Sequence, residues 1–392
     1  MLNKDLLLQL TIVLAILMLG FILRAETINL HGISIDEKSF YQDDHGLPYF
    51  YELDSYYNYR LTHNFLDHGY LGDEIIDGRE WDLHSYYPPG VPLDYPPLIV
   101  YLTAFLYRVV NFFSNVPLHM ISFWLPSFIA PLAGVIAYFF TRRFTNELGA
   151  LAAGILTVMA PFYFTRTVPG WFDTDMFNIM FPLLIVWIFT EAVMIKNLKK
   201  SLTLSILAGI VMFLFSTAWN GWQYLFYIIF AFNVLYILWC KIKGRNILPL
   251  ILILSIFIST TILLIVFCTG SLNLINVLQG PIELFRLSNS NNIWSPWPDV
   301  YTSVSELKKP SFTELVGGFG VLLLGGIFGF FWTGRFLSNE NLKNRYLKKM
   351  NWDFYIFLVI WSIIGFFSLT KGVRFIILVI PPLIISTGIL IG

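Results

Sequence analysis

Acidic residues at three places in the sequence could bind a metal ion or take part in acid–base chemistry. The clearest pair is Asp173 and Asp175, in the stretch Gly170-Trp171-Phe172-Asp173-Thr174-Asp175-Met176-Phe177-Asn178 between two long apolar runs. Two carboxylates one residue apart can share a hard divalent cation, which prefers oxygen ligands. The same break could begin a helix, in which case Asp173 or Asp175 would cap it. Taken alone, the stretch favours the helix cap.

Two further acidic sites show the same ambiguity. Asp54 lies in Glu52-Leu53-Asp54-Ser55-Tyr56-Tyr57-Asn58-Tyr59-Arg60, where the acidic head could cap a helix whose tyrosines lie at a membrane interface. Glu306 ends Thr302-Ser303-Val304-Ser305-Glu306, where Ser303 and Glu306 could form a capping box. Lys371 and Arg374 could be cations that snorkel from a helix end to the interface. Whether these residues lie close together depends on how the helices that carry them are arranged.

The composition predicts a membrane protein. Of the 392 residues, 56% are hydrophobic and 13% are charged, which is typical of a polytopic membrane protein. The net charge of zero provides no basic face, so we expect no nucleic-acid partner. Cys240 and Cys268 lack metal-binding or redox spacing. The leading apolar run 6–23 is longer than a typical signal-peptide core, so we predict a retained first span.

We predict an all-α polytopic protein with about ten transmembrane helices in a single domain, residues 1–392. A span needs roughly 17 to 25 mostly apolar residues. The ten segments that qualify are 6–23, 119–140, 147–165, 176–195, 202–218, 222–240, 247–267, 315–333, 353–369 and 373–391. An eleventh apolar segment, 98–113, carries Arg108 and polar flanks.

Basic residues determine how the eleventh segment is interpreted, because they collect in cytoplasmic loops. If 98–113 is an interfacial helix, four basic clusters fall on one side: Arg142/Arg143, Lys196/Lys199/Lys200, Lys241/Lys243/Arg245 and Arg335/Lys343/Arg345/Lys348/Lys349. All three acidic sites and Lys371/Arg374 then fall on the extracytoplasmic side of the cell membrane. This places a long structured first external loop at 23–118 and a flexible external loop at 268–314.

A common outer face changes the interpretation of the acidic residues. Carboxylates that hold a hard cation, beside cations that can neutralise phosphate, are suited to a pyrophosphate leaving group. In a membrane, the phosphate carrier could be a lipid. Transporters carry charged residues near the middle of the bilayer, and the predicted spans here have none at that depth. The residues therefore indicate a metal-dependent transferase that uses a lipid-phosphate donor.

Several motifs resemble a known family. The first external loop of the catalytic subunit of oligosaccharyltransferase, in its archaeal form, is resembled by four motifs: Tyr51-Glu52-Leu53-Asp54-Ser55-Tyr56-Tyr57, His68-Gly69-Tyr70, Trp81-Asp82 and Tyr87-Pro88-Pro89-Gly90. The stretch 170–175 resembles that family's second acidic motif, and 303–306 resembles its external-loop motif ending in glutamate. The resemblance implies a GT-C-type membrane domain that transfers an oligosaccharide from a polyprenyl (dolichyl) phosphate or pyrophosphate to Asn in Asn-X-Ser/Thr.

The resemblance also implies roles for individual residues. A Mn²⁺ or Mg²⁺ ion would be surrounded by four carboxylates: Asp54, Asp173, Asp175 and Glu306. Asp54 and Glu306 would also engage the acceptor amide. Arg374 would neutralise the donor phosphate, and Arg166 would help to shape the acceptor site. Trp219 and Tyr224, at the ends of Trp-Asn-Gly-Trp-Gln-Tyr, would touch the donor head group.

One part of the family pattern is missing from these residues. The family's soluble C-terminal domain, whose Trp-Trp-Asp-Tyr-Gly motif reads the acceptor's hydroxyl residue, has no counterpart, so we expect that domain to be absent. Either the chain is a fragment, or it is a compact paralogue that needs a separate acceptor-recognition domain or subunit, or is inactive without one. An alternative function is a polyprenyl-phosphate-dependent glycosyltransferase with a non-protein acceptor.

Overall fold

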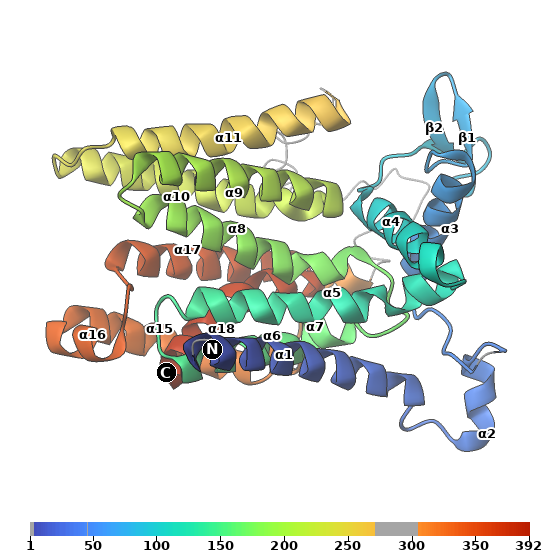
Figure 1. The fold of residues 1–392 in the computed structure, drawn as a ribbon, viewed down its shortest axis with the longest axis horizontal. Helices are drawn as coiled ribbons and strands as arrows, with labels where there is room; N and C mark the ends of the chain where they lie inside the picture. The colour runs from blue at the N-terminus through green and yellow to red at the C-terminus, as the bar shows by residue number, and fades with distance from the viewer. Residues whose placement is uncertain (1–3, 45, 271–304) are drawn as a thin grey trace.

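The computed structural model describes residues 4–44, 46–270 and 305–392, so Thr302, Ser303 and most of the predicted loop 268–314 lie outside it. Within these residues the protein is a bundle of long helices (Figure 1). Nine segments of the described chain are long and apolar enough to cross a membrane. They are built on α1 (Lys4–Ala25), α5 (Leu118–Thr141), α8 (Phe177–Met194), α9 (Leu198–Ala218), α10 (Gln223–Ile242), α11 (Leu248–Thr269), α15 (Val321–Ser338), α17 (Trp352–Ser368) and α18 (Ile376–Ile391).

The predicted span 147–165 differs from the other nine because it is two helices. Helix α6 covers Glu147–Met159 and α7 covers Pro161–Thr165. Proline has no N–H to donate and clashes with the preceding turn, so Pro161 begins a new helix instead of continuing the old one. The 13 residues of α6 rise only about 20 Å, which is less than the roughly 30 Å hydrocarbon core.

The segment 98–113 forms helix α4 (Leu98–Phe113), which has 16 residues and is shorter than the nine span-length segments. It contacts α3 (Leu53–His68) at one end of the bundle (Figure 1), and its placement at the membrane interface stays a prediction. The described segment between α1 and α4 is not purely helical, because it also contains a small sheet. Strands β1 (Glu74–Ile76), β2 (Arg79–Asp82) and β3 (Val91–Pro92) pair antiparallel in that order.

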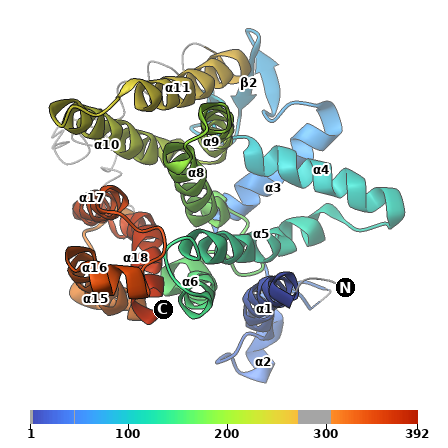
Figure 2. The same ribbon diagram turned by 60° about the vertical axis from the view of Figure 1, so that its left-hand side comes forward.

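Helices α5, α6, α8 and α18 make up the centre of the bundle, with α1 outside α5 and α6, and α9 and α11 beyond α8 (Figure 2). Among the nine span-length segments, the one that contains α18 is the most enclosed, with 78% of its most apolar stretch buried, against 11% for the segment that contains α1. Small residues let α6 and α18 approach closely. A Cβ on Gly149 would lie 2.2 Å from the carbonyl oxygen of Gly388.

The two ends of the bundle differ in chemistry. The α8–α9 and α10–α11 connections and α16 (Glu340–Tyr346), which hold three of the basic clusters, lie at the left end of Figure 1. The α5–α6 connection, with Arg142 and Arg143, lies at the same end. Helices α3 and α4 and the sheet lie at the opposite end. The predicted grouping of basic clusters is therefore present as a spatial arrangement.

Short elements complete the connections. The helices are α2 (Ile35–Lys38) and α14 (Phe312–Phe319), and the 3₁₀ turns are η1 (Glu26–Asn29), η2 (Ser39–Tyr41), η3 (Thr174–Met176), η4 (Asn220–Trp222), η5 (Ser305–Leu307), η6 (Leu369–Lys371) and η7 (Val373–Phe375). A capping box is present at the start of α14, formed by Ser311 and Glu314. The capping box predicted from Ser303 lies outside the described residues.

Candidate active site

Helix α3 brings the first acidic motif to the site. It begins after Glu52, with Asp54 in its first turn, where a carboxylate interacts favourably with the helix dipole. It ends at Gly69, whose φ of 87° is the left-handed conformation that glycine adopts readily at a helix C-terminus. Residues 55, 58 and 61 are buried, a spacing that presents one face to the rest of the protein.

That buried face is hydrogen-bonded to the second acidic motif. Phe172 N donates to Ser55 Oγ at 2.9 Å, and Asn58 Nδ2 donates to Phe172 O at 3.0 Å. Tyr51 N also donates to Gly170 O at 3.2 Å. These bonds join residues more than a hundred positions apart in the chain. They fix α3 against the loop that leads into Asp173.

The second acidic motif is itself held from inside the bundle. Gly170 has φ 86° and donates its N–H to Phe123 O at 2.8 Å, while a Cβ there would lie 2.9 Å from the Phe123 ring. Phe172 is fully buried, and Tyr163 Oη donates to Met176 O at 2.7 Å. Asp173 precedes η3, but its side chain makes no capping hydrogen bond. Asp173 therefore occupies the predicted cap position, but its side chain does not form the capping hydrogen bond.

Three carboxyl groups meet where α3 faces this loop. One oxygen each from Glu52, Asp54 and Asp173 lies within 4.8 Å of the others. Burial, reinforced by the nearby charges of Asp173, Asp175 and Asp54, raises the pKa of Glu52 to about 9. Burial also raises the pKa of Asp173, and the charge of Asp175 adds to the effect. Such crowding disfavours three negative charges and would be relieved by a cation.

Arg166 joins the other two predicted acidic residues. Its Nη1 lies 2.9 Å from Asp175 Oδ2, and its Nη2 is hydrogen-bonded to Glu306 Oε1. Burial works to lower the pKa of Arg166, but the charges of Asp175 and Glu306 outweigh burial and raise it. Asn178 Nδ2 donates to the second oxygen of Asp175 at 3.0 Å. Arg374 Nη1 approaches Glu306 Oε2 at 4.0 Å.

A close backbone contact places Glu306 beside Arg374. Val373 N donates to Lys308 O at 2.9 Å, which joins the chain after η5 to η7. A Cβ at Gly372 would lie 2.6 Å from Glu306 O and 2.9 Å from Leu307 Cα. Real Cβ atoms do not approach so closely, so the contact requires glycine at position 372.

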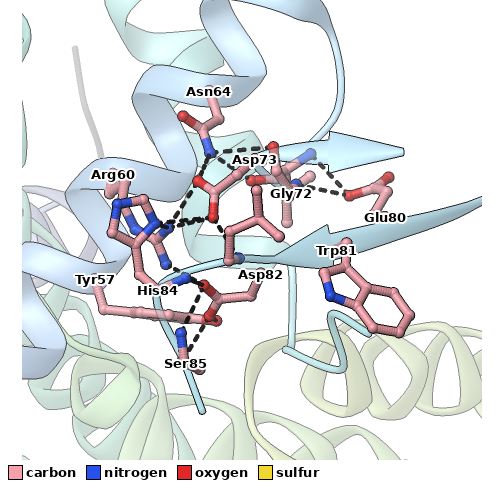
Figure 3. A network of polar contacts seen from close by, with 12 residues as sticks. Tyr57, Arg60, Asn64, Gly72, Asp73, Glu80, Trp81, Asp82, His84 and Ser85 are labelled. Atoms are coloured by element: carbon pink, nitrogen blue, oxygen red, sulfur yellow. Dashed lines mark hydrogen bonds and ion pairs between the residues drawn. The ribbon is translucent and has the colours of Figure 1, made fainter. Parts of the chain in front are cut away.

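A polar network anchors α3 to the hairpin of β1 and β2 (Figure 3). Arg60 Nη1 lies 2.6 Å from Asp73 Oδ2, and Arg60 Nη2 lies 2.9 Å from Asp82 Oδ1. Tyr57 Oη and Ser85 Oγ donate to Asp82 Oδ2 at 3.0 and 2.7 Å. Burial would raise the pKa of Asp82, yet the Ser85 and Arg60 hydrogen bonds outweigh burial and hold it below its usual range. We assign these residues to supporting α3, since a guanidinium already compensates both carboxylates.

Arg24 supports the site from the end of α1. Its side chain is fully buried and donates to Thr167 Oγ1 from both Nε (3.0 Å) and Nη2 (2.8 Å). Its Nη1 donates to Val158 O and Gly20 O, each at 3.0 Å. Thr167 directly follows Arg166 in the chain. The first helix therefore holds the turn from which Arg166 extends.

Comparison with known proteins gives the family. The family described as "Oligosaccharyl transferase STT3, N-terminal" matches residues 21–392. The chain belongs to this family. A dolichyl-phosphooligosaccharide-protein glycotransferase of Methanococcus voltae is 30% identical over 419 residues, covering 97% of this chain and 45% of the relative. The chain thus spans about half the length of that relative.

Solved structures of the STT3 family share the fold. The Archaeoglobus fulgidus oligosaccharyltransferase AglB, in complex with an inhibitory peptide and a dolichol-phosphate, superposes with a TM-score of 0.67 at 16% identity, covering 96% of this chain and 50% of AglB. A complex of the Archaeoglobus fulgidus enzyme with Zn and sulfate gives a TM-score of 0.58 at 16% identity, over 95% and 48% of the two chains. At this identity the likeness establishes the GT-C-type fold.

The sequence motifs gave no role to several residues that the structure places at the STT3 site. Glu52 lies two positions before Asp54, the same spacing as Asp173 and Asp175, which could have indicated a second carboxylate pair. Ser55, Asn58 and Asn178 gave no signal of their own. Trp219 and Tyr224 pack together at the α9–α10 junction with ring centroids 6.1 Å apart. Their predicted contact with a donor stays a prediction.

Proposed function

We propose that this chain is the membrane domain of an oligosaccharyltransferase that glycosylates protein. The donor would be an oligosaccharide on a polyprenyl (dolichyl) phosphate or pyrophosphate, and the acceptor an Asn side chain in Asn-X-Ser/Thr. One observation carries the proposal: Asp54, Asp173, Asp175 and Glu306 gather with Arg166 and Arg374 at one end of the bundle. The similarity to a dolichyl-phosphooligosaccharide-protein glycotransferase of Methanococcus voltae supports it.

A divalent cation, Mn²⁺ or Mg²⁺, would be held by Asp54, Asp173, Asp175 and Glu306. All four residues offer the carboxylate oxygens that a hard cation prefers. One oxygen each from Asp54 and Asp173 lies within 4.8 Å of the other, which is compatible with the roughly 4–5 Å width of such an ion's coordination sphere. The zinc and sulfate in a related structure support a site for a divalent cation and an anion. When bound, the ion would stabilise the negative charge that develops on the leaving phosphate.

The acceptor amide would be engaged by Asp54 and Glu306. In the reaction, the amide nitrogen bonds to the anomeric carbon of the glycan, the bond from that carbon to the phosphate oxygen breaks, and one amide proton is lost. An amide nitrogen is a poor nucleophile, so carboxylates that accept its N–H hydrogens would orient it for attack. Asp54 is solvent-exposed and can reach such a ligand.

The two arginines would act differently. The Arg374 side chain is 40% exposed, and its Nη1 is as far as 4.0 Å from Glu306 Oε2. Because this ion pair is long, Arg374 can pair with the donor phosphate instead. The Arg166 side chain is 15% exposed and is already paired with two carboxylates, so it would shape the acceptor site instead. We place this site on the extracytoplasmic face of an integral membrane protein, because the basic clusters lie at the opposite end.

Transfer to a sequon peptide tests the function. Membranes containing the chain would be incubated with lipid-linked oligosaccharide, an Asn-X-Thr peptide and Mn²⁺, with and without an added acceptor-recognition domain from a relative. We expect glycopeptide in at least one of the two arms, and none from an otherwise identical Gln-X-Thr peptide. Failure in both arms, with glycan transferred to a non-protein acceptor, would replace this function with the alternative transferase.

A further inference from the structure

We infer that Glu52 is an additional ligand of the divalent cation, beside Asp54 and Asp173. The inference rests on the metal requirement of the proposed function and adds a residue of this chain to the site. It follows from where the Glu52 carboxyl group lies, what surrounds it, and what holds it there.

The position of the carboxyl group is the first argument. One Glu52 oxygen lies within 4.8 Å of oxygens from both Asp54 and Asp173. Glu52 Oε1 is inaccessible to solvent and has no hydrogen-bond partner in the described part of the chain. A buried carboxylate oxygen without a donor is costly, unless it serves a ligand.

The chain on either side of Glu52 leaves its side chain little freedom. Tyr51 N is bonded to Gly170 O, and Ser55 Oγ accepts from Phe172 N. Both partners belong to the loop that carries Asp173, so Glu52 is fixed between two attachment points to that loop. Glu52 also occupies the cap position of α3, yet its side chain makes no capping hydrogen bond. Helix capping therefore does not explain its orientation.

The remaining acidic residues are compensated differently. Asp175 and Glu306 are both paired with Arg166, and Asp175 also accepts from Asn178. Glu52, Asp54 and Asp173 form the less compensated half of the acidic group. A cation that enters the site would be attracted most strongly to these three carboxyl groups. Glu52 would then supply the third carboxylate facing the ion.

Metal binding by the whole chain, without donor or acceptor, tests the assignment. Mn²⁺ binding to the detergent-solubilised protein would be followed by the EPR signal of the free ion. Glu52→Gln keeps the side-chain shape and removes the charge, so we expect the Mn²⁺ Kd to rise at least tenfold. The matched control is Glu37→Gln on α2, an exposed glutamate of the same external segment, whose Kd should stay within twofold of the parent.

Thermal melting distinguishes a ligand from a structural residue. A ligand variant should melt without metal at or above the parent temperature, and should lose most of the stabilisation that saturating Mn²⁺ gives the parent. An unchanged Kd in Glu52→Gln would overturn the assignment. Glu52→Asp, which keeps the charge on a shorter side chain, should weaken binding less than Glu52→Gln, and it provides the same test if the Gln variant does not fold.

The outcomes separate this inference from the proposed function. Mn²⁺ binding that depends on Glu52, without any glycan transfer, would support the ligand assignment and count against the transferase. Glycopeptide formation together with a Glu52-independent Kd would support the transferase and overturn the assignment.

Discussion

Glu306 lies between two guanidinium groups that differ in their freedom. Arg166 stacks over the rings of Phe162 and Trp171, at 4.7 and 5.4 Å from their centroids, and pairs with Glu306 and Asp175. Arg374 is more exposed and only marginally within ion-pair distance. A planar, stacked guanidinium is suited to holding two carboxylates in place, whereas the exposed one can exchange partners when an anion arrives.

Substitution of Arg374 should therefore affect the donor first. We expect Arg374→Ala to raise the KM for lipid-linked oligosaccharide about tenfold or more, the usual range for a lost charge-assisted hydrogen bond, with a smaller effect on the peptide KM. Steady-state glycopeptide formation measures both constants. Lys309→Ala, which removes an exposed cation three residues after Glu306, is the control. Equal effects on both substrates would contradict a phosphate-binding role.

The carboxylates should be separately essential. We expect Asp54→Ala, Asp173→Ala and Glu306→Ala each to reduce metal-dependent transfer by roughly 10²-fold or more, because each removes a proposed ligand of the ion, and Asp54 and Glu306 would also engage the acceptor. Membrane insertion should be unaffected. Transfer activity in washed membranes, scaled to the inserted protein, measures the effect. Retained activity in any two of the single variants would disprove the shared-metal site.

At the scale of elements, the site is assembled by contacts between backbone segments rather than by one helix. Helix α3 is attached to the second acidic motif through Phe172, and η5 is attached to η7 through Val373 and Gly372. Arg166 lies between these two halves and bonds to both. Small displacements of either half would separate the carboxylates, so activity should be sensitive to changes that leave the fold intact.

Gly372→Ala tests this sensitivity. The added methyl group would meet Glu306 O at 2.6 Å, so η5 must move away from η7 and carry Glu306 with it. We expect activity to fall about tenfold or more, since misplacement of a reacting group by about 1 Å can cost 10²-fold. Gly317→Ala is the matched control, because no atom lies within 4 Å of its added Cβ and alanine favours the helix. Similar activity in the two variants would contradict the close contact.

The elements and the site could be predicted to different extents. Nine apolar span-length helices and a shorter helix at 98–113 follow from hydropathy, which is a local property of the sequence. The break in 147–165 depends on Pro161, and a hydropathy window averages over it. The bonds from Ser55 and Asn58 join residues 117 and 114 positions apart, so no local pattern could reveal them. The sequence spacing pairs Glu52 with Asp54, whereas only the folded chain brings Glu52 beside Asp173.

For the whole molecule, the main feature is polarity along the bundle. The acidic site occupies one end, and the basic connections between helices occupy the other (Figure 1). Basic residues near span ends remain in the cytoplasm during insertion, so this polarity also predicts the orientation of the protein. The lipid-linked donor and the polypeptide acceptor would then reach the site from outside the cell.

Cysteine labelling measures that orientation. In a background in which Cys240 and Cys268 are replaced by serine, Glu37→Cys on α2 should react with a membrane-impermeant maleimide in intact cells. Asn341→Cys on α16 should react only after the membrane is opened. Both positions are exposed and lie on elements at opposite ends of the described bundle, so each is the control for the other. The reverse pattern of labelling would invert the topology.

The contacts of Arg24 have a consequence for the order in which the protein assembles. During synthesis α1 is made before α6 and α7, and apart from Gly20 O in its own helix the acceptors of Arg24 are 134 and 143 residues further along the chain. Most of the hydrogen bonds of Arg24 therefore form only after α6 and α7 have been made and have packed against α1. The turn that carries Arg166 is completed by the same step. Assembly of the proposed site is therefore coupled to the stable burial of α1 during biogenesis.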